Sequence, residues 1–251
     1  MTGRIFIKQT SSSQAASAEV SGLKALETLL QSLPQRSIAI PSVISQQGSR
    51  LELVHIDACR PSEMLWQSAG ADLATLHNQP QPRFGWEQDN FIGLNPQLNR
   101  WSDNWGDFFV NFRLGPQLGW FAGSPNAQLY HSILERQRVR LIEYLNETVQ
   151  HPSLVHGDLW SGNLLFDTNQ PWLIDPAVYC ADAEVDIAMT RMFGSFSASF
   201  YQTYRELRPA PTDIERRHQF YNLYHALNHA NLFGGGYFQL CQQGFELLER
   251  L

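Results

Sequence analysis

The segment LVHGDLWSGNLLF, which begins at residue 154, constrains the fold more than any other part of the sequence. Its two apolar runs enclose a cluster of polar residues and two glycines. A further apolar run, WLI, follows after DTNQP, a composition typical of turns. We therefore expect a β-hairpin that pairs residues 164–166 with 172–174. Such a hairpin presents three polar side chains at one edge: Asp158, Asn163 and Asp175.

These polar residues form a pattern that is typical of one kind of chemistry. His156, Asp158 and Asn163 give His-x-Asp-x-x-x-x-Asn, which is the pattern of kinase catalytic loops, and Asp175 ends the next strand. Phosphoryl transfer needs a carboxylate that orients and deprotonates the acceptor hydroxyl. It also needs oxygen ligands that hold Mg²⁺ against the nucleotide phosphates. Asp158 is therefore the candidate base, and Asn163 and Asp175 are the candidate Mg²⁺ ligands.

An H-G-D tripeptide alone often marks only a turn whose aspartate caps a helix. The complete set is more specific, because four polar residues occur in the required order on a predicted loop–strand–turn–strand. We therefore favour the catalytic interpretation over the structural one.

The N-terminal part of the chain supplies residues that suit the same chemistry. Lys8 lies on the strand-like IFIK, as does the lysine that contacts the α- and β-phosphates of ATP in kinases. Glu19 lies near the start of the next predicted helix, where the ion-pair partner of that lysine belongs. The strand LELVHI would end beside the adenine, with backbone groups of Val54, His55 and Ile56 facing the base.

The periodicity of the sequence predicts an α+β protein with two lobes. Strands are expected at 4–9, 38–44 and 50–56, a polar linker at 10–17, and helices at 18–33 and 63–79. Beyond residue 63 the chain reads as mainly helical. We therefore predict a small nucleotide-binding lobe at residues 1–57 and a larger catalytic and substrate lobe at 58–251.

The composition limits the classes of partner that we expect the protein to bind. The formal net charge is −6 and the chain has no run of Lys or Arg, so we expect neither nucleic-acid nor membrane-surface binding. No apolar run approaches the length of a membrane span, and the first ten residues do not resemble a signal peptide. The cysteines are Cys59, Cys180 and Cys241, whose wide spacing indicates neither disulfides nor a zinc site. A cytoplasmic location is the simplest expectation.

Two features separate this chain from protein kinases. Trp160 stands where protein kinases carry a lysine, and Asp186 follows Asp175 too soon for a long activation segment. HPSLVHGDLWSGN, together with DPAVYCADAEVDIAM, instead resembles the fructosamine (ketosamine) kinases, relatives of aminoglycoside phosphotransferases. The resemblance extends from Ile5 to about Tyr237 and includes the block that begins FGWEQDNFIGLNPQ.

This resemblance implies a protein-kinase-like fold and ATP-dependent phosphorylation of a sugar hydroxyl on a ketosamine, which repairs glycated amines. It also implies that the indole of Trp160 stacks on the sugar. Asp186 is expected to brace the catalytic loop by hydrogen bonds. The block after Phe84 contains Asp89, Gln97, Asn99 and Arg113, which either shape the acceptor pocket or, as we favour, are surface polar residues.

Two alternatives stay open at this stage. The acceptor could be another small hydroxyl compound, such as an aminoglycoside. The chain could also be a catalytically weak binding protein, because the family has a strand–glycine loop–strand unit before the lysine strand and only four residues precede Ile5 here. That shortness predicts an exposed sheet edge, weak ATP binding and poor solubility. The presence of all five candidate residues favours an enzyme: Lys8, Glu19, Asp158, Asn163 and Asp175.

Overall fold

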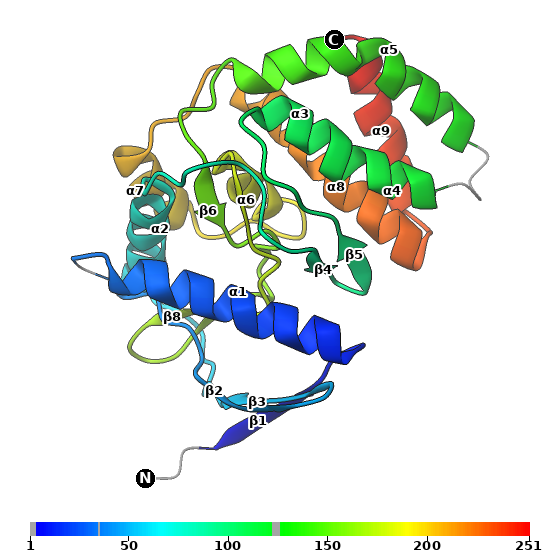
Figure 1. The fold of residues 1–251 in the computed structure, drawn as a ribbon. Coiled ribbons are helices and arrows are strands. Elements are labelled where there is room, and N and C mark those ends of the chain that lie inside the picture. The colour runs from blue at the N-terminus through cyan, green and yellow to red at the C-terminus, as the bar shows by residue number, and fades with distance from the viewer. Residues whose placement is uncertain (1–3, 35, 122–125) are drawn as a thin grey trace.

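The computed structural model describes residues 4–34, 36–121 and 126–251, and it has a small sheet lobe beside a larger helical lobe (Figure 1). The small lobe contains β1 (Ile5–Gln9), α1 (Ser13–Gln31), β2 (Val43–Gln47) and β3 (Arg50–Val54). The helices of the larger lobe are α2 (Glu63–His77), α3 (Trp105–Phe109), the π-helix η1 (Val110–Leu114), α4 (Gly115–Trp120), α5 (Ala127–Asn146), α6 (Glu184–Met189), α7 (Ala198–Leu207), α8 (Ile214–Phe233) and α9 (Tyr237–Glu249). Its strands are β4 (Asn90–Ile92), β5 (Asn95–Gln97), β6 (Ser153–Val155), β7 (Leu164–Phe166), β8 (Pro171–Leu173) and β9 (Tyr179–Ala181). The predicted α+β architecture is confirmed.

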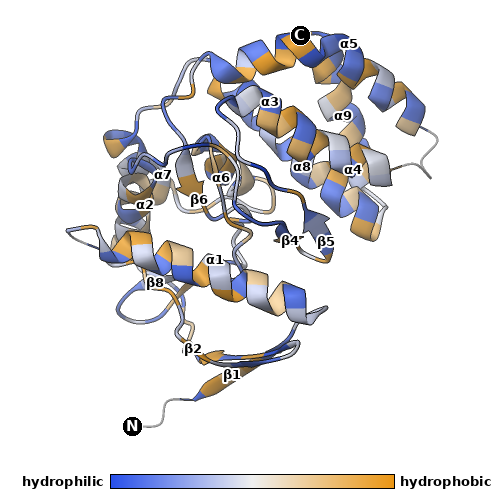
Figure 2. Ribbon diagram, viewed as in Figure 1, coloured by the Kyte–Doolittle hydropathy of each residue, from blue (hydrophilic) through white to orange (hydrophobic). Residues whose placement is uncertain are grey.

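The sheet of the small lobe is antiparallel in the order β1–β3–β2, so β1 is an edge strand. Within the described residues β1 pairs with β3 alone, and its apolar side chains Ile5, Phe6 and Ile7 are each about half exposed. Figure 2 shows β1 coloured as a hydrophobic segment, and it is an edge strand of its sheet. The predicted exposed sheet edge is therefore confirmed.

Helix α1 begins five residues earlier than its sequence pattern predicted. The side chain of Ser12 accepts a hydrogen bond from the backbone N–H of Ala15 and so caps the helix. The following QAAS consists of helix-compatible residues, and Ala16 is buried. The prediction of a linker at 10–17 was therefore wrong from residue 13 onward, because a serine cap was interpreted as loop composition.

The second strand is also displaced from its predicted position. Ile38 and Ile40 are buried, as a strand at 38–44 would require. Strand β2 nevertheless starts only at Val43, beyond Pro41. Ala39 instead forms an isolated parallel bridge with Trp172 of β8. The apolar run at 38–40 is thus explained by contact with the larger lobe. The β2–β3 turn lies at Gly48, whose φ is +58°.

The expected hairpin near the catalytic motif is present. Strands β7 and β8 pair antiparallel, with Leu164 opposite Leu173. Strand β8 ends at Leu173, one residue before the predicted end at residue 174. Phe166, Leu164 and Leu173 belong to a buried cluster that also contains leucines of α1 and α2. This shared core fixes the hairpin against both lobes, so that the loops at its edge have a rigid support.

Residues 55–62 lie in neither a helix nor a strand, and they join β3 to α2. The division of the chain at residue 57 stays our interpretation. Helix α1 contacts β2 and β3 on one side and β4 on the other, and Figure 1 shows it between the sheet and the helical lobe. The three cysteines are free, as expected. In the described ranges we find no helix with the length and apolar character that a membrane span requires.

Candidate active site

His156 holds the catalytic loop, residues 156–163, to the strand that ends before Asp175. Its ring Nδ1 accepts a hydrogen bond from the backbone N–H of Asp158 at 3.2 Å, and its Nε2 donates to the carbonyl of Ile174 at 2.8 Å. This pair of bonds requires the neutral tautomer with hydrogen on Nε2. Complete burial accordingly lowers the pKa of His156. His156 therefore links the backbone N–H of Asp158, the candidate base, to the carbonyl of Ile174, which directly precedes the candidate metal ligand Asp175.

Asp186 braces the same loop, as predicted. Its carboxylate accepts hydrogen bonds from the backbone N–H groups of His156 (2.7 Å) and Gly157 (2.9 Å) and from the ring of His77 (3.2 Å). Burial acts to raise the pKa of Asp186, but the hydrogen bond from His77 and the other contacts hold it below its ordinary value. A φ of +81° at Gly157, and the carbonyl of Ala177 where a Cβ would stand, leave room only for glycine there.

The side chain of Asn163 contacts Asp158 across the loop. The side-chain N–H of Asn163 donates to the carbonyl of Asp158 at 2.8 Å and to its carboxylate at 3.2 Å. Burial raises the pKa of Asp158 to about 7; the hydrogen bond from Asn163 acts in the opposite direction, and the negative charges of Asp175 and Asp186 add to the rise. A carboxylate with a pKa near neutrality is well suited to accept a proton from a hydroxyl.

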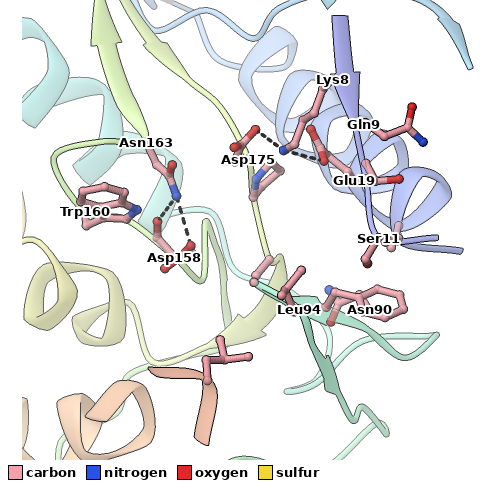
Figure 3. Close-up of a pocket in the computed structure, with 18 of the residues that line it drawn as sticks. Lys8, Gln9, Ser11, Glu19, Asn90, Leu94, Asp158, Trp160, Asn163 and Asp175 are labelled. Atoms are coloured by element: carbon pink, nitrogen blue, oxygen red, sulfur yellow. Dashed lines mark hydrogen bonds and ion pairs between the residues drawn. The ribbon is translucent and has the colours of Figure 1, made fainter. Parts of the chain in front are cut away.

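Lys8 links the two lobes through ion pairs. Its ammonium lies 2.9 Å from Glu19 on α1 and 2.7 Å from Asp175 (Figure 3). Burial acts to lower the pKa of Lys8, but the two carboxylates together raise it, so the ammonium stays charged. Burial raises the pKa of Glu19, with Lys8 opposing the rise. The predicted pairing of Lys8 with Glu19 is thus present in the structure, and Asp175 completes the cluster.

One cavity of about 360 Å³ is lined by five of these side chains: Lys8, Glu19, Asp158, Asn163 and Asp175. In Figure 3, Asp158, Trp160 and Asn163 come from the catalytic loop, whereas Lys8 and Glu19 face them from β1 and α1. The rest of the lining is mixed: it includes apolar residues such as Leu94 and Phe233, and polar residues such as Gln9, Ser11 and Asn90.

Trp160 is 37% exposed, and its ring makes an edge contact with Phe193 at a centroid distance of 6.2 Å. A Cβ on Gly162 would overlap the indole, so this glycine lets the ring fold over the loop. The ring lines the cavity and is partly exposed. Its role at the acceptor side stays a prediction.

The arrangement of oxygen atoms fits a divalent cation. Within the described part of the chain, the side-chain oxygen of Asn163 accepts no hydrogen bond, and both Asn163 and Asp175 line the cavity. Glu19 and Asp175 pair with the ammonium of Lys8, and Asp158 lines the same cavity, so the site has excess negative charge when all three carboxylates are ionised. No group of three or more His, Cys, Asp or Glu side chains is placed to hold a metal among the described residues. Two protein ligands suit Mg²⁺, which takes its other ligands from phosphates and water.

A smaller cavity of about 180 Å³ adjoins the first, and Asp175 lines both. It contains the predicted hinge residues Val54, His55 and Ile56 among mostly apolar neighbours. The backbone N–H groups of Val54 and His55 are already used, because they donate to carbonyls of Ser42 and Arg4 at 3.0 Å each. Of the three residues, only Ile56 has an N–H without a hydrogen bond to the described chain, so it is the one N–H of the three that is available to a base. The role of the three residues beside the adenine stays a prediction.

A buried polar network behind the site was not expected from the sequence. Gln97 donates to Asn90 (2.8 Å) and to the carbonyl of Ala177 (3.0 Å), while Asn90 donates to the carbonyl of Val178 (2.8 Å). These bonds fasten the β4–β5 hairpin to the backbone that follows Asp175.

Two further residues of this network, Asn99 and Arg113, are also buried, and Arg113 donates to the side-chain oxygen of Asn99 at 2.8 Å. The interpretation of Gln97, Asn99 and Arg113 as surface residues was wrong, whereas Asp89 is exposed. The sequence contained a signal, since the polar residues Asp89, Gln97, Asn99 and Arg113 occur together in a block with many aromatic residues. Buried polar groups require hydrogen-bond partners, so such a group of polar residues can mark a buried network.

Known proteins share this arrangement of sequence and fold. A family model described as fructosamine kinase matches residues 2–250. A protein of Synechocystis sp. named probable ketoamine kinase is 41% identical over 248 residues, which are 96% of this chain and 81% of that protein. The ketosamine-3-kinase of Mus musculus is 31% identical over 201 residues, which are 79% of this chain and 65% of the mouse protein.

The comparison with solved structures identifies the same family. A crystal structure of a Haemophilus somnus protein assigned as a fructosamine-3-kinase aligns with a TM-score of 0.79 and 26% identity, and it covers 97% of this chain and 82% of that one. The family model spans residues of both lobes, among them the loop at 156–163 and the strand that carries Lys8. Since the family model spans almost the whole chain, and a relative with 41% identity covers 96% of it, this protein belongs to the fructosamine kinase family.

Proposed function

We propose that this protein transfers the γ-phosphoryl group of ATP to a sugar hydroxyl of a ketosamine. The observation that carries this proposal is the single cavity that joins Asp158 to the Lys8–Glu19–Asp175 cluster. Family membership and relatives named ketoamine or ketosamine kinases support the choice of acceptor. No comparison favours an aminoglycoside or an inactive binding role.

The roles of the protein groups follow from their positions. The adenine would lie in the cavity beside Ile56, whose N–H has no partner within the described chain and can donate to the base, and the phosphates would extend past Asp175 toward Lys8. The ammonium of Lys8, kept in place by Glu19, would contact phosphate oxygens. Asp158 would orient the acceptor hydroxyl and take its proton, while the hydrogen bond from Asn163 fixes the carboxylate.

Asn163 and Asp175 would hold Mg²⁺ between the loop and the phosphates. Bound there, the ion would neutralise charge that develops on the transferred group. Asp175 has a φ of +53°, a conformation that sets its carboxylate at the cavity side of the strand end. The ion pair with Lys8 keeps that carboxylate in place.

The activity is tested by comparing acceptors under identical conditions. ATP consumption is measured with ribulosyl-lysine, with fructosyl-lysine and with an aminoglycoside. We expect turnover with at least one of the two ketosamines and none with the aminoglycoside. Turnover of the aminoglycoside alone would replace the proposed acceptor, and no turnover of any acceptor would favour the binding-protein alternative.

We predict that activity falls as the pH decreases below about 7. Asp158 must be ionised to accept a proton, and its pKa is raised to about 7. At limiting concentrations of both substrates, kcat/KM should therefore fall about tenfold for each pH unit below the pKa and level off above it. The measurement is a pH profile of kcat/KM from pH 5.5 to 9. A profile that stays flat between pH 5.5 and 8 would contradict the assignment of Asp158 as the base.

We also predict that Trp160→Ala raises the KM for the ketosamine several-fold and leaves the KM for ATP unchanged. An aromatic contact is worth about 0.5–1.5 kcal/mol, which sets this magnitude. Gly162→Ala should have a smaller effect in the same direction, because the added methyl group displaces the indole. Phe112→Leu serves as a control at an aromatic position outside the cavity. If both KM values rise equally in Trp160→Ala, or its melting temperature collapses, the residue is part of the core instead.

A further inference from the structure

A second cavity, of about 330 Å³, adjoins the catalytic cavity on the side of helix α1. We call it the α1 groove; it is lined by Ser13, Gln14, Ser17 and Ser21 of α1 and by Trp86 and Asp89 of the facing segment. Figure 1 shows that the N-terminal half of α1 lies beside the β4–β5 hairpin, and contacts between α1 and β4 agree. Ala18, Asn90 and Phe91 line both cavities, so the groove continues the space in which Asp158 lies.

The walls of this groove are polar but carry little charge. The four α1 residues are exposed and recur at intervals that place them on one face of the helix. Across from them, Trp86 pairs with Trp101 at a centroid distance of 6.3 Å. No lysine or arginine is among the residues that line the groove, and Asp89 is its one carboxylate.

Asp89 is fixed in place by the loop that follows it. One carboxylate oxygen accepts a hydrogen bond from the backbone N–H of Asn99 at 2.7 Å, and Arg100 lies 3.5 Å from the same oxygen. Asn99 is itself held by Asn90 and Arg113 in the buried network. Because both side chains of the Asp89–Arg100 pair are exposed, the pair leaves the carboxylate free to attract a further cation.

This inference rests on the proposed function. A ketosamine consists of a sugar and the amine-bearing carrier to which it is attached. When the sugar hydroxyl reaches Asp158, the carrier must leave the catalytic cavity in some direction. Part of that cavity is lined by exposed apolar side chains, among them Leu94 and Phe233, which would leave peptide N–H and C=O groups without partners. The α1 groove instead offers hydroxyl and amide groups to such a main chain.

We propose that the α1 groove binds the polypeptide that carries the ketosamine. The segment bound there is the peptide main chain on either side of the glycated lysine, and a cationic side chain near the glycated residue faces Asp89. Ala18, at the junction of the two cavities, is small enough to leave a passage for the glycated side chain. Ser13, Ser17 and Ser21 supply hydrogen-bond partners along the groove.

The test compares two forms of one substrate. The first is a ribulosyl- or fructosyl-lysine at the centre of a peptide of about seven residues with an arginine next to it, and the second is the same glycated lysine as a single blocked residue. Ser21→Trp fills the groove from an exposed helix position whose side chain has no hydrogen bond in the described structure. Thr28→Trp, at another exposed position of the same helix outside the groove, is the matched control.

We expect Ser21→Trp to lower kcat/KM for the peptide about tenfold, entirely through KM, and to leave the single residue within about twofold of wild type. Asp89→Asn should weaken the peptide with arginine more than a peptide with alanine at that position. Thr28→Trp should behave as wild type. Equal kinetics of wild type and Ser21→Trp with the peptide would overturn the proposal.

Failure of the proposed function gives a different result. In that case the wild type phosphorylates neither form, and binding of a fluorescently labelled unglycated peptide decides on the groove. Binding by wild type that is lost in Ser21→Trp and kept in Thr28→Trp supports a peptide site. Equal binding by all three proteins, or no binding by wild type, would rule it out.

Discussion

Asp158→Asn should lower the turnover of a ketosamine by about 10²–10⁴-fold, the range that general-base assistance supplies. The amide keeps the shape of the side chain but cannot accept the hydroxyl proton. Asn163 and His156 still contact the backbone of residue 158, so the loop has its main supports. The measurement is the rate of ADP formation at saturating MgATP and ketosamine.

Thermal stability separates loss of chemistry from loss of the fold in this variant. The pKa of Asp158 is raised from 3.8 to about 7 in the folded protein, so the folded state keeps a proton that the unfolded chain releases between these values. The stability that this proton contributes is complete below the lower value and is lost as the pH rises toward 7. Above pH 7 the neutral amide should therefore leave the melting temperature unchanged or raise it.

Glu143→Gln, at an exposed position of α5, is the matched control and should have the activity of wild type. A folded Asp158→Asn protein with near-normal turnover would show that Asp158 is not the base.

Asp175→Ala should abolish the Mg²⁺ dependence of ATP binding and lower turnover by on the order of 10³-fold, because charge stabilisation by a metal is worth several kcal/mol. Asn163→Ala should act in the same direction but less strongly, since an amide oxygen is a weaker ligand than a carboxylate. Lys8 keeps its ion pair with Glu19 in the Asp175 variant, so the small lobe should stay folded. The measurement is a titration of ATP affinity with and without Mg²⁺.

Asp103→Ala removes an exposed carboxylate that does not line the cavity, and it should keep the wild-type response to Mg²⁺. If Asp175→Ala and Asn163→Ala both respond to Mg²⁺ as this control does, the metal is held by other groups.

The sequence predicted the parts of the site that depend on local order along the chain. The hairpin, the bracing role of Asp186 and the pair of Lys8 with Glu19 each follow from motif spacing on adjacent elements, and each is present. The roles of Asp158, Asn163 and Asp175 in catalysis stay predictions. The structure brings these residues into one cavity, which is the arrangement that the roles require.

The parts that could not be predicted depend on contacts between distant segments. Arg113 is completely buried because its guanidinium stacks 3.8 Å from the ring of Tyr179 and bonds to Asn99, and no local pattern identifies those partners. The N–H of His55 is used by Arg4, a strand pairing that depends on the register of β1 and β3. Burial of polar groups is determined by tertiary pairing, whereas composition indicates only that they are polar.

The central claim is tested most directly by the chemical identity of the product. The wild-type protein is incubated with MgATP and fructosyl-lysine or ribulosyl-lysine, and the mixture is analysed by ³¹P NMR and mass spectrometry. The account predicts a ketosamine that carries one phosphoryl ester on a sugar hydroxyl, formed in equal amount to ADP and absent with Asp158→Asn. ADP formed with only inorganic phosphate as its partner, or phosphorylation of the amine carrier in place of the sugar, would contradict it.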